Sequence, residues 1–160
     1  MTQTADAPYA DLLDRLDALL ADKGPIADPL ALAEAHLLDG EMVLETWLVA
    51  KGAVPTRDRV EGYRLLALHR QGAKGDTTFN ACRETCREIV YLRNVIALYD
   101  DDAAQARHHL RLQVMVLRHL ALFVGGKLQE AGLGDFCCSS RPIRSAAADT
   151  DPISARLAGE

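Results

Sequence analysis

Leucine and alanine dominate this chain, and their spacing is the feature that most limits how it folds. Together they make up nearly a third of the 160 residues, whereas aromatic residues account for only 5%. Leucine and alanine favour helices, and the aromatic residues that favour strands are scarce. Apolar residues also recur at the three- and four-residue intervals of an α-helix. The sequence therefore predicts an all-α protein.

Capping residues divide this pattern into five predicted helices. Asp28 is a suitable N-cap that precedes a proline, and Gly52 is a typical helix stop. Pro55 and Thr56 mark another start, and Asp76 or Thr77 caps the helix after it. The predicted helices cover residues 8–22, 28–51, 55–72, 76–99 and 103–131. Four long helices joined by short loops indicate an antiparallel helical bundle, to which the short N-terminal helix is added.

The length and the two ends of the chain predict a single cytoplasmic domain. A chain of 160 residues buries a core of its own without disulfides or metals. We expect a flexible N-terminus over residues 1–7, one helical-bundle domain over residues 8–144, and a mobile C-terminal tail over residues 145–160. The N-terminus has no basic residues or apolar run of a signal peptide, and charged residues interrupt the longest apolar stretch, residues 110–128. No membrane partner is expected.

Charge is distributed unevenly along the chain. Residues 1–50 hold ten acidic and two basic residues, a net charge of −8, whereas residues 51–144 carry a net charge of +5. We expect acidic early helices to lie against basic later ones, within one subunit or across a dimer. Binding to nucleic acid is disfavoured, because acidic residues are interleaved with the basic ones and stacking aromatics are few.

Apolar residues cover more than one face of the helices predicted between residues 29 and 131, notably between positions 110 and 123. A helix that is apolar all round must be covered on every side. A homodimer, or docking to a larger protein, would provide that cover. The first function class is therefore a small interaction or regulatory protein of unknown pathway.

Motifs of known bundle chemistry are missing. The spacings of di-iron sites, zinc peptidases, phosphate-binding loops and dinucleotide-binding loops do not occur, so no catalytic residue is predicted. Glu41 and Glu45 lie one turn apart, but such a pair usually faces solvent. His108 and His119 are three turns apart, roughly 16 Å, so one metal cannot bridge them. These histidines and His109 are expected to be core or capping residues, or neighbours of a site.

Cys82 and Cys86 are the sharpest candidates for a functional site. Their spacing of four residues places both thiols on one helical face, which Arg93 continues. The simplest interpretation is that both cysteines fill the core. A nearby guanidinium would instead favour the thiolate over the thiol.

A second pair, Cys137 and Cys138, is adjacent in sequence. Their Cα atoms are about 3.8 Å apart, too close for an unstrained disulfide. If Cys82, Cys86 and this pair converge, they form a sufficient ligand set for zinc or an iron centre, although the spacings match no common motif. The second function class is therefore a metal-binding or thiol-redox sensing bundle.

Overall fold

The computed structural model describes residues 8–99 and 101–132. Their contacts divide them into two compact units, which are described separately: residues 11–121, and a smaller unit made of residues 8–10 and 122–132. The described residues are predominantly helical and contain no strand, so the all-α prediction is confirmed. The tail predicted for residues 145–160 and the N-terminus predicted for residues 1–7 lie outside the described residues.

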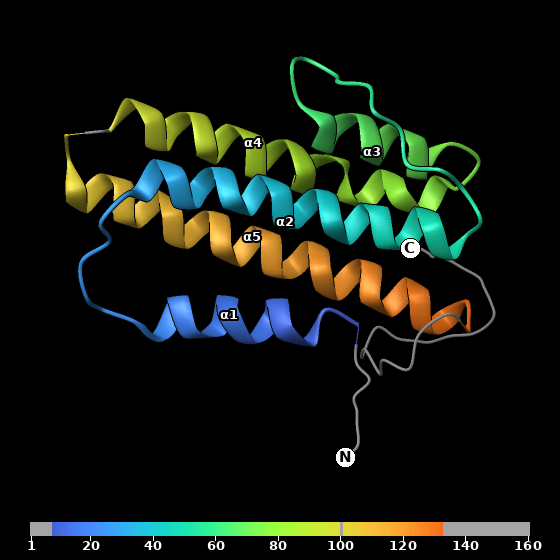
Figure 1. The fold of residues 1–160 in the computed structure, drawn as a ribbon, viewed down its shortest axis with the longest axis horizontal. Coiled ribbons are helices and arrows are strands. Elements are labelled where there is room, and N and C mark those ends of the chain that lie inside the picture. Colours follow the sequence, from blue (N-terminus) through green and yellow to red (C-terminus); the bar gives the residue numbers. More distant parts are fainter. Residues whose placement is uncertain (1–7, 100, 133–160) are drawn as a thin grey trace. The chain divides into compact units, whose positions relative to one another are not determined.

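Five α-helices and one 3-10 helix follow each other along the chain (Figure 1). Asp28 caps α2 as predicted, because its carboxylate accepts a hydrogen bond from the Ala31 amide at 3.1 Å. Asp102 caps α5 in the same way through the Gln105 amide. The helices are α1 (Ala10–Ala21), α2 (Pro29–Ala50), α3 (Arg64–Ala73), η1 (Thr77–Cys82), α4 (Arg83–Leu98) and α5 (Ala103–Glu130).

The prediction that the third helix begins near Pro55 is wrong. Residues 53–63 form an irregular segment, and α3 is a short helix of 10 residues, so the count of four long helices is also wrong. Glu61 and Gly62 have φ angles of 55° and 89° and make a tight turn that no helix accommodates. The Gln71 side chain holds the segment in place by bonding Val54 and Thr56.

The start of the fourth predicted helix also differs. Residues 77–82 wind as the 3-10 helix η1, and the α-helix begins only at Arg83. Asp76 caps this segment by accepting a hydrogen bond from the Thr78 amide at 3.1 Å. Cys82 therefore lies at the junction of two helix types, whereas Cys86 lies within α4.

In the unit of residues 11–121, α2 packs against both α3 and α4 (Figure 1). α2 and α4 run in opposite directions, since Glu34 near the start of α2 pairs with Arg93 near the end of α4, while Trp47 near the end of α2 stacks on Phe79 of η1, the helix that leads into α4. The buried core of this unit is mostly leucine, with Phe79 and Trp47 as its large aromatic residues. This packing places α3 beside the start of α4, where the candidate site lies.

Acidic residues of the early helices pair with arginines of later ones, as the charge distribution predicted. Asp17 of α1 bonds Arg118 of α5 at 2.7 Å, and Glu34 of α2 bonds Arg93 at 2.6 Å. Glu41 and Glu45, the paired carboxylates of the sequence, both bond Arg64 of α3. These two carboxylates therefore form an ion-paired cluster within one chain.

A buried polar pair links α2 to α5. His36 and Gln113 are 1% and 0% exposed, and the His36 Nδ1 atom lies 2.8 Å from the Gln113 Oε1 atom. Because that oxygen only accepts, Nδ1 carries the proton. Burial lowers the pKa of His36, so the ring stays neutral at pH 7. The Gln113 Nε2 atom also donates to the carbonyl oxygens of Ala33 on α2 and Ile89 on α4, so this side chain links three helices.

Among the described residues, none of the helices combines the length and the apolar character needed to cross a bilayer.

Candidate functional site

Cys82 and Cys86 are both buried, with 1% and 0% of their surfaces exposed. Cys82 is the last residue of η1, and Cys86 lies in the first turns of α4. The two cysteines, four residues apart, therefore lie on either side of the junction between the two helices. The Cys86 thiol donates a hydrogen bond to the Cys82 sulfur. The prediction that they share a face is therefore confirmed.

A third residue, His69 of α3, joins the thiols. Its Nε2 atom lies 2.7 Å from the carbonyl oxygen of Phe79, and the Cys82 sulfur lies 3.3 Å from the same oxygen. Since a carbonyl only accepts, Nε2 carries a proton. The ring also hydrogen-bonds the Cys82 side chain. Sequence analysis missed His69, because no motif connects it with residues thirteen positions later.

These contacts separate the acidities of the two thiols. The hydrogen bond from Cys86 lowers the pKa of Cys82 to about 6, with a further contribution from His69, although burial acts in the opposite direction. The hydrogen bond to Cys82 and burial both raise the pKa of Cys86. Burial lowers the pKa of His69, but its hydrogen bonds to Cys82 and Phe79 outweigh this and raise it. Cys82 is therefore the more acidic of the two thiols, and it lies beside the imidazole of His69.

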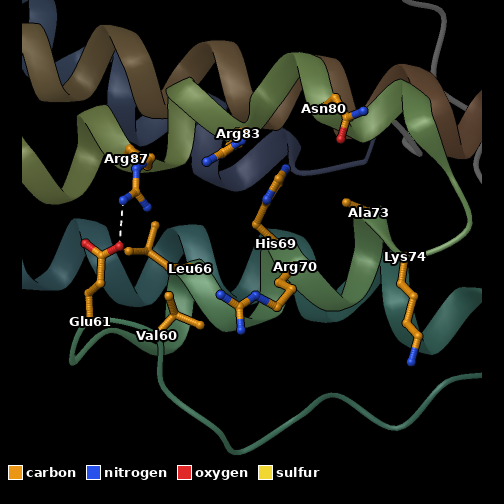
Figure 2. Close-up of a pocket in the computed structure, with 10 residues that line it drawn as sticks. All are labelled: Val60, Glu61, Leu66, His69, Arg70, Ala73, Lys74, Asn80, Arg83 and Arg87. Atoms are coloured by element: carbon orange, nitrogen blue, oxygen red, sulfur yellow. Dashed lines mark hydrogen bonds and ion pairs between the residues drawn. The ribbon is translucent and has the colours of Figure 1, made fainter.

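His69 also lines a cavity of about 450 Å³. Two neighbouring helices contribute to the lining of this cavity (Figure 2). His69 and Arg70 belong to α3, and Arg83 and Arg87 belong to α4. The same imidazole thus contacts both the cavity and the buried Cys82.

The other candidate residues of the sequence lie elsewhere. Arg93 donates to the Glu34 carboxylate at 2.6 Å and to the side chain of its neighbour Asn94 at 2.9 Å. Its positive charge is therefore paired with a carboxylate. His69, and not Arg93, is the basic residue that hydrogen-bonds Cys82.

His108 and His119 are exposed within α5, so the expectation that the histidines of this helix are core or capping residues is wrong for these two. His109 stacks on Tyr99 with ring centroids 5.4 Å apart and donates from Nδ1 to the Gln105 carbonyl, and its ring meets the His108 ring edge-on. His119 is exposed and lines a groove between α4 and α5.

Cys137 and Cys138 lie outside the described residues, so the predicted convergence of four cysteines concerns a part of the chain that the structure does not describe. Within residues 8–99 and 101–132, no three or more His, Cys, Asp or Glu side chains are grouped so as to hold a metal ion.

The fold and the site together define a helical protein with a buried pair of hydrogen-bonded thiols. The chain matches no model of a known protein family, and comparisons with curated proteins and with solved structures found nothing similar to it.

Proposed function

We propose that this protein is a small regulatory helical protein in which Cys82 and Cys86 form an oxidant-responsive thiol pair. The sequence leaves two function classes open, and the placement of His69 beside Cys82 supports thiol-based regulation. Cysteines that only fill a core need no basic neighbour, whereas a reactive thiol does. A cytoplasmic location, where thiols are kept reduced, would hold the pair in its reduced state until an oxidant arrives.

The chemistry that suits this pair is reduction of a peroxide. The Cys82 thiolate attacks one peroxide oxygen, so that an S–O bond forms, the O–O bond breaks, and hydroxide or an alkoxide leaves. The Cys86 sulfur then attacks the Cys82 sulfenic acid, which forms the S–S bond and releases water. At 1.5 Å of helical rise per residue, the Cα atoms of residues 82 and 86 lie roughly 6 Å apart along the helix axis. This separation is within the usual range for a disulfide.

Oxidation would change the local structure, because Cys82 lies where η1 meets α4. A disulfide sulfur carries neither a proton nor a negative charge, so oxidation would weaken the contacts of the Cys82 sulfur with the Phe79 carbonyl and with His69. The junction, and the cavity that His69 lines, would then rearrange. In this proposal that rearrangement is the regulatory signal.

Peroxide treatment tests the proposal in a Cys137→Ser/Cys138→Ser background, which leaves only the buried pair. Stoichiometric hydrogen peroxide is expected to remove both thiols and two hydrogen atoms of mass, and a dithiol reductant is expected to reverse the change. In Cys86→Ser, oxidation should stop at a Cys82 sulfenic acid that dimedone traps. Cys82→Ser should react much more slowly, because the pKa of Cys86 is raised.

Peptide mapping by mass spectrometry locates the modified sulfur in each variant. The proposal fails if the background protein keeps both thiols at peroxide concentrations that oxidise free cysteine. It also fails if Cys82→Ser and Cys86→Ser react at the same rate, since the two cysteines would then be interchangeable.

The metal-binding alternative stays a prediction. A zinc or iron centre held by Cys82, Cys86, Cys137 and Cys138 needs two ligands that lie outside the described residues.

We also propose that the helices form an antiparallel bundle that dimerises through α4 and α5. Opposite directions of α2 and α4 support the bundle. Support for the dimer comes from Leu112 and Met115 of α5, which are 36% and 54% exposed. Together with Val116 they line a groove between α4 and α5. A second copy of the chain would bury this apolar surface.

Light scattering tests the dimer at micromolar concentration. The wild-type mass is expected to be twice 17.4 kDa. Met115→Glu should shift the protein to a monomer, because association would bury an unpaired carboxylate. Val54→Glu is the matched control, since Val54 is 85% exposed outside the groove, and should leave the mass unchanged. A wild-type mass of 17.4 kDa that does not change with salt would contradict the dimer.

A further inference from the structure

The cavity between α3 and α4 is lined by an excess of positive charge. Arg70, Lys74, Arg83 and Arg87 contribute four cations to its lining, and Glu61 is the carboxylate among its lining residues. Glu61 pairs with Arg87 at 2.6 Å, and a dashed line marks this ion pair in Figure 2. That pair is neutral, so the other three cations set the charge of the cavity.

Most arginines of residues 11–121 that do not line this cavity have an ion-pair or hydrogen-bond partner. Four of them form ion pairs, and Arg59, Arg107 and Arg111 donate to backbone carbonyls. Within the part of the chain that the structure describes, by contrast, Arg70 and Arg83 have neither an ion pair nor a hydrogen bond from their side chains. Two unpaired guanidinium groups from different helices therefore line the same cavity.

The remaining walls of the cavity are partly apolar. Val60, Leu66 and Ala73 line it together with the polar residues. Its volume of about 450 Å³ falls within the usual range of small-molecule sites. A ligand that matches these walls has an anionic group and an apolar body of small-molecule size.

We propose that this cavity binds a small organic phosphate. Guanidinium groups match the oxygens of a phosphate in bidentate geometry, and such charge-assisted hydrogen bonds are strong. A phosphate monoester carries a charge of about −1.5 to −2 at pH 7. The charges of Arg70, Lys74 and Arg83 match it better than they match the single charge of a carboxylate. This site is distinct from the thiol pair, although His69 contacts both.

Calorimetric titration tests the proposal with phenyl phosphate and with benzoate at matched ionic strength. These probes share an aromatic body and differ in their anionic group. Phenyl phosphate is expected to bind at least about tenfold more tightly than benzoate. The double variant Arg70→Gln/Arg83→Gln should weaken phenyl phosphate binding by about tenfold or more, because it removes the charge-assisted hydrogen bonds from both helices. Both positions are exposed, so we expect this variant to fold.

Arg57→Gln is the matched control, because Arg57 is an exposed arginine that does not line the cavity, and its binding should equal that of wild type. Cys82→Ser should also retain binding, so failure of the thiol proposal and failure of this one are distinguishable. The proposal is overturned if phenyl phosphate does not bind at millimolar concentration, if benzoate binds equally well, or if the double variant binds like wild type.

Discussion

Phe79→Ala is expected to lower the free energy of unfolding by about 3–5 kcal/mol, the usual cost of truncating a fully buried aromatic side chain. Phe79 is 0% exposed and stacks on Trp47, with ring centroids 5.4 Å apart, and on His69, at 6.2 Å. Alanine would leave a cavity where α2, α3 and η1 meet. Denaturant unfolding followed by circular dichroism measures the loss.

Two further variants separate this packing effect from a general loss of aromatic surface. Tyr91→Ala removes an aromatic residue that is 59% exposed, and should change the stability by no more than about 0.5 kcal/mol. Gly72→Ala places a methyl group 2.8 Å from the Phe79 ring, and should destabilise the wild type more than it destabilises Phe79→Ala. Equal losses in Phe79→Ala and Tyr91→Ala would contradict the position of the ring in the core.

The second large effect is expected in the ionisation of Cys82. Its pKa of about 6 lies below the ordinary value of 9.0, so the thiolate exists above pH 6 and is lost as the pH falls through 6. Ultraviolet absorbance of the thiolate, followed in the Cys137→Ser/Cys138→Ser background, should therefore show a midpoint near pH 6. Cys86→Ala removes the largest contribution to the lowered pKa, and should move the midpoint toward alkaline pH.

Cys82→Ser is the control for this titration, and should abolish the transition near pH 6, because the pKa of the remaining Cys86 is raised. His69→Gln should move the midpoint in the same direction as Cys86→Ala, since His69 also lowers the pKa of Cys82. A wild-type midpoint near pH 9, unchanged by either substitution, would show that the thiols are ordinary core residues.

Local sequence signals were sufficient for the long helices. Asp28 and Pro29 define the start of α2 because a cap and a fixed φ act within one turn. The shared face of Cys82 and Cys86 was likewise predictable, since a four-residue spacing keeps side chains on one side of a helix. Each of these inferences depends on neighbours within a few positions of the chain.

The sequence by itself thus determined the helical class, most helix ends and the shared helical face of Cys82 and Cys86. Tertiary structure decided where α3 begins, because bonds from the distant Gln71 hold residues 53–63 out of a helix. It also decided that His69 contacts Cys82, and that Arg70 and Arg83 line one cavity. These contacts join residues 13 positions apart through the packing of α3 against η1 and α4. No local sequence pattern predicts such contacts, because the helix faces that meet are determined by burial of apolar surface over the whole core.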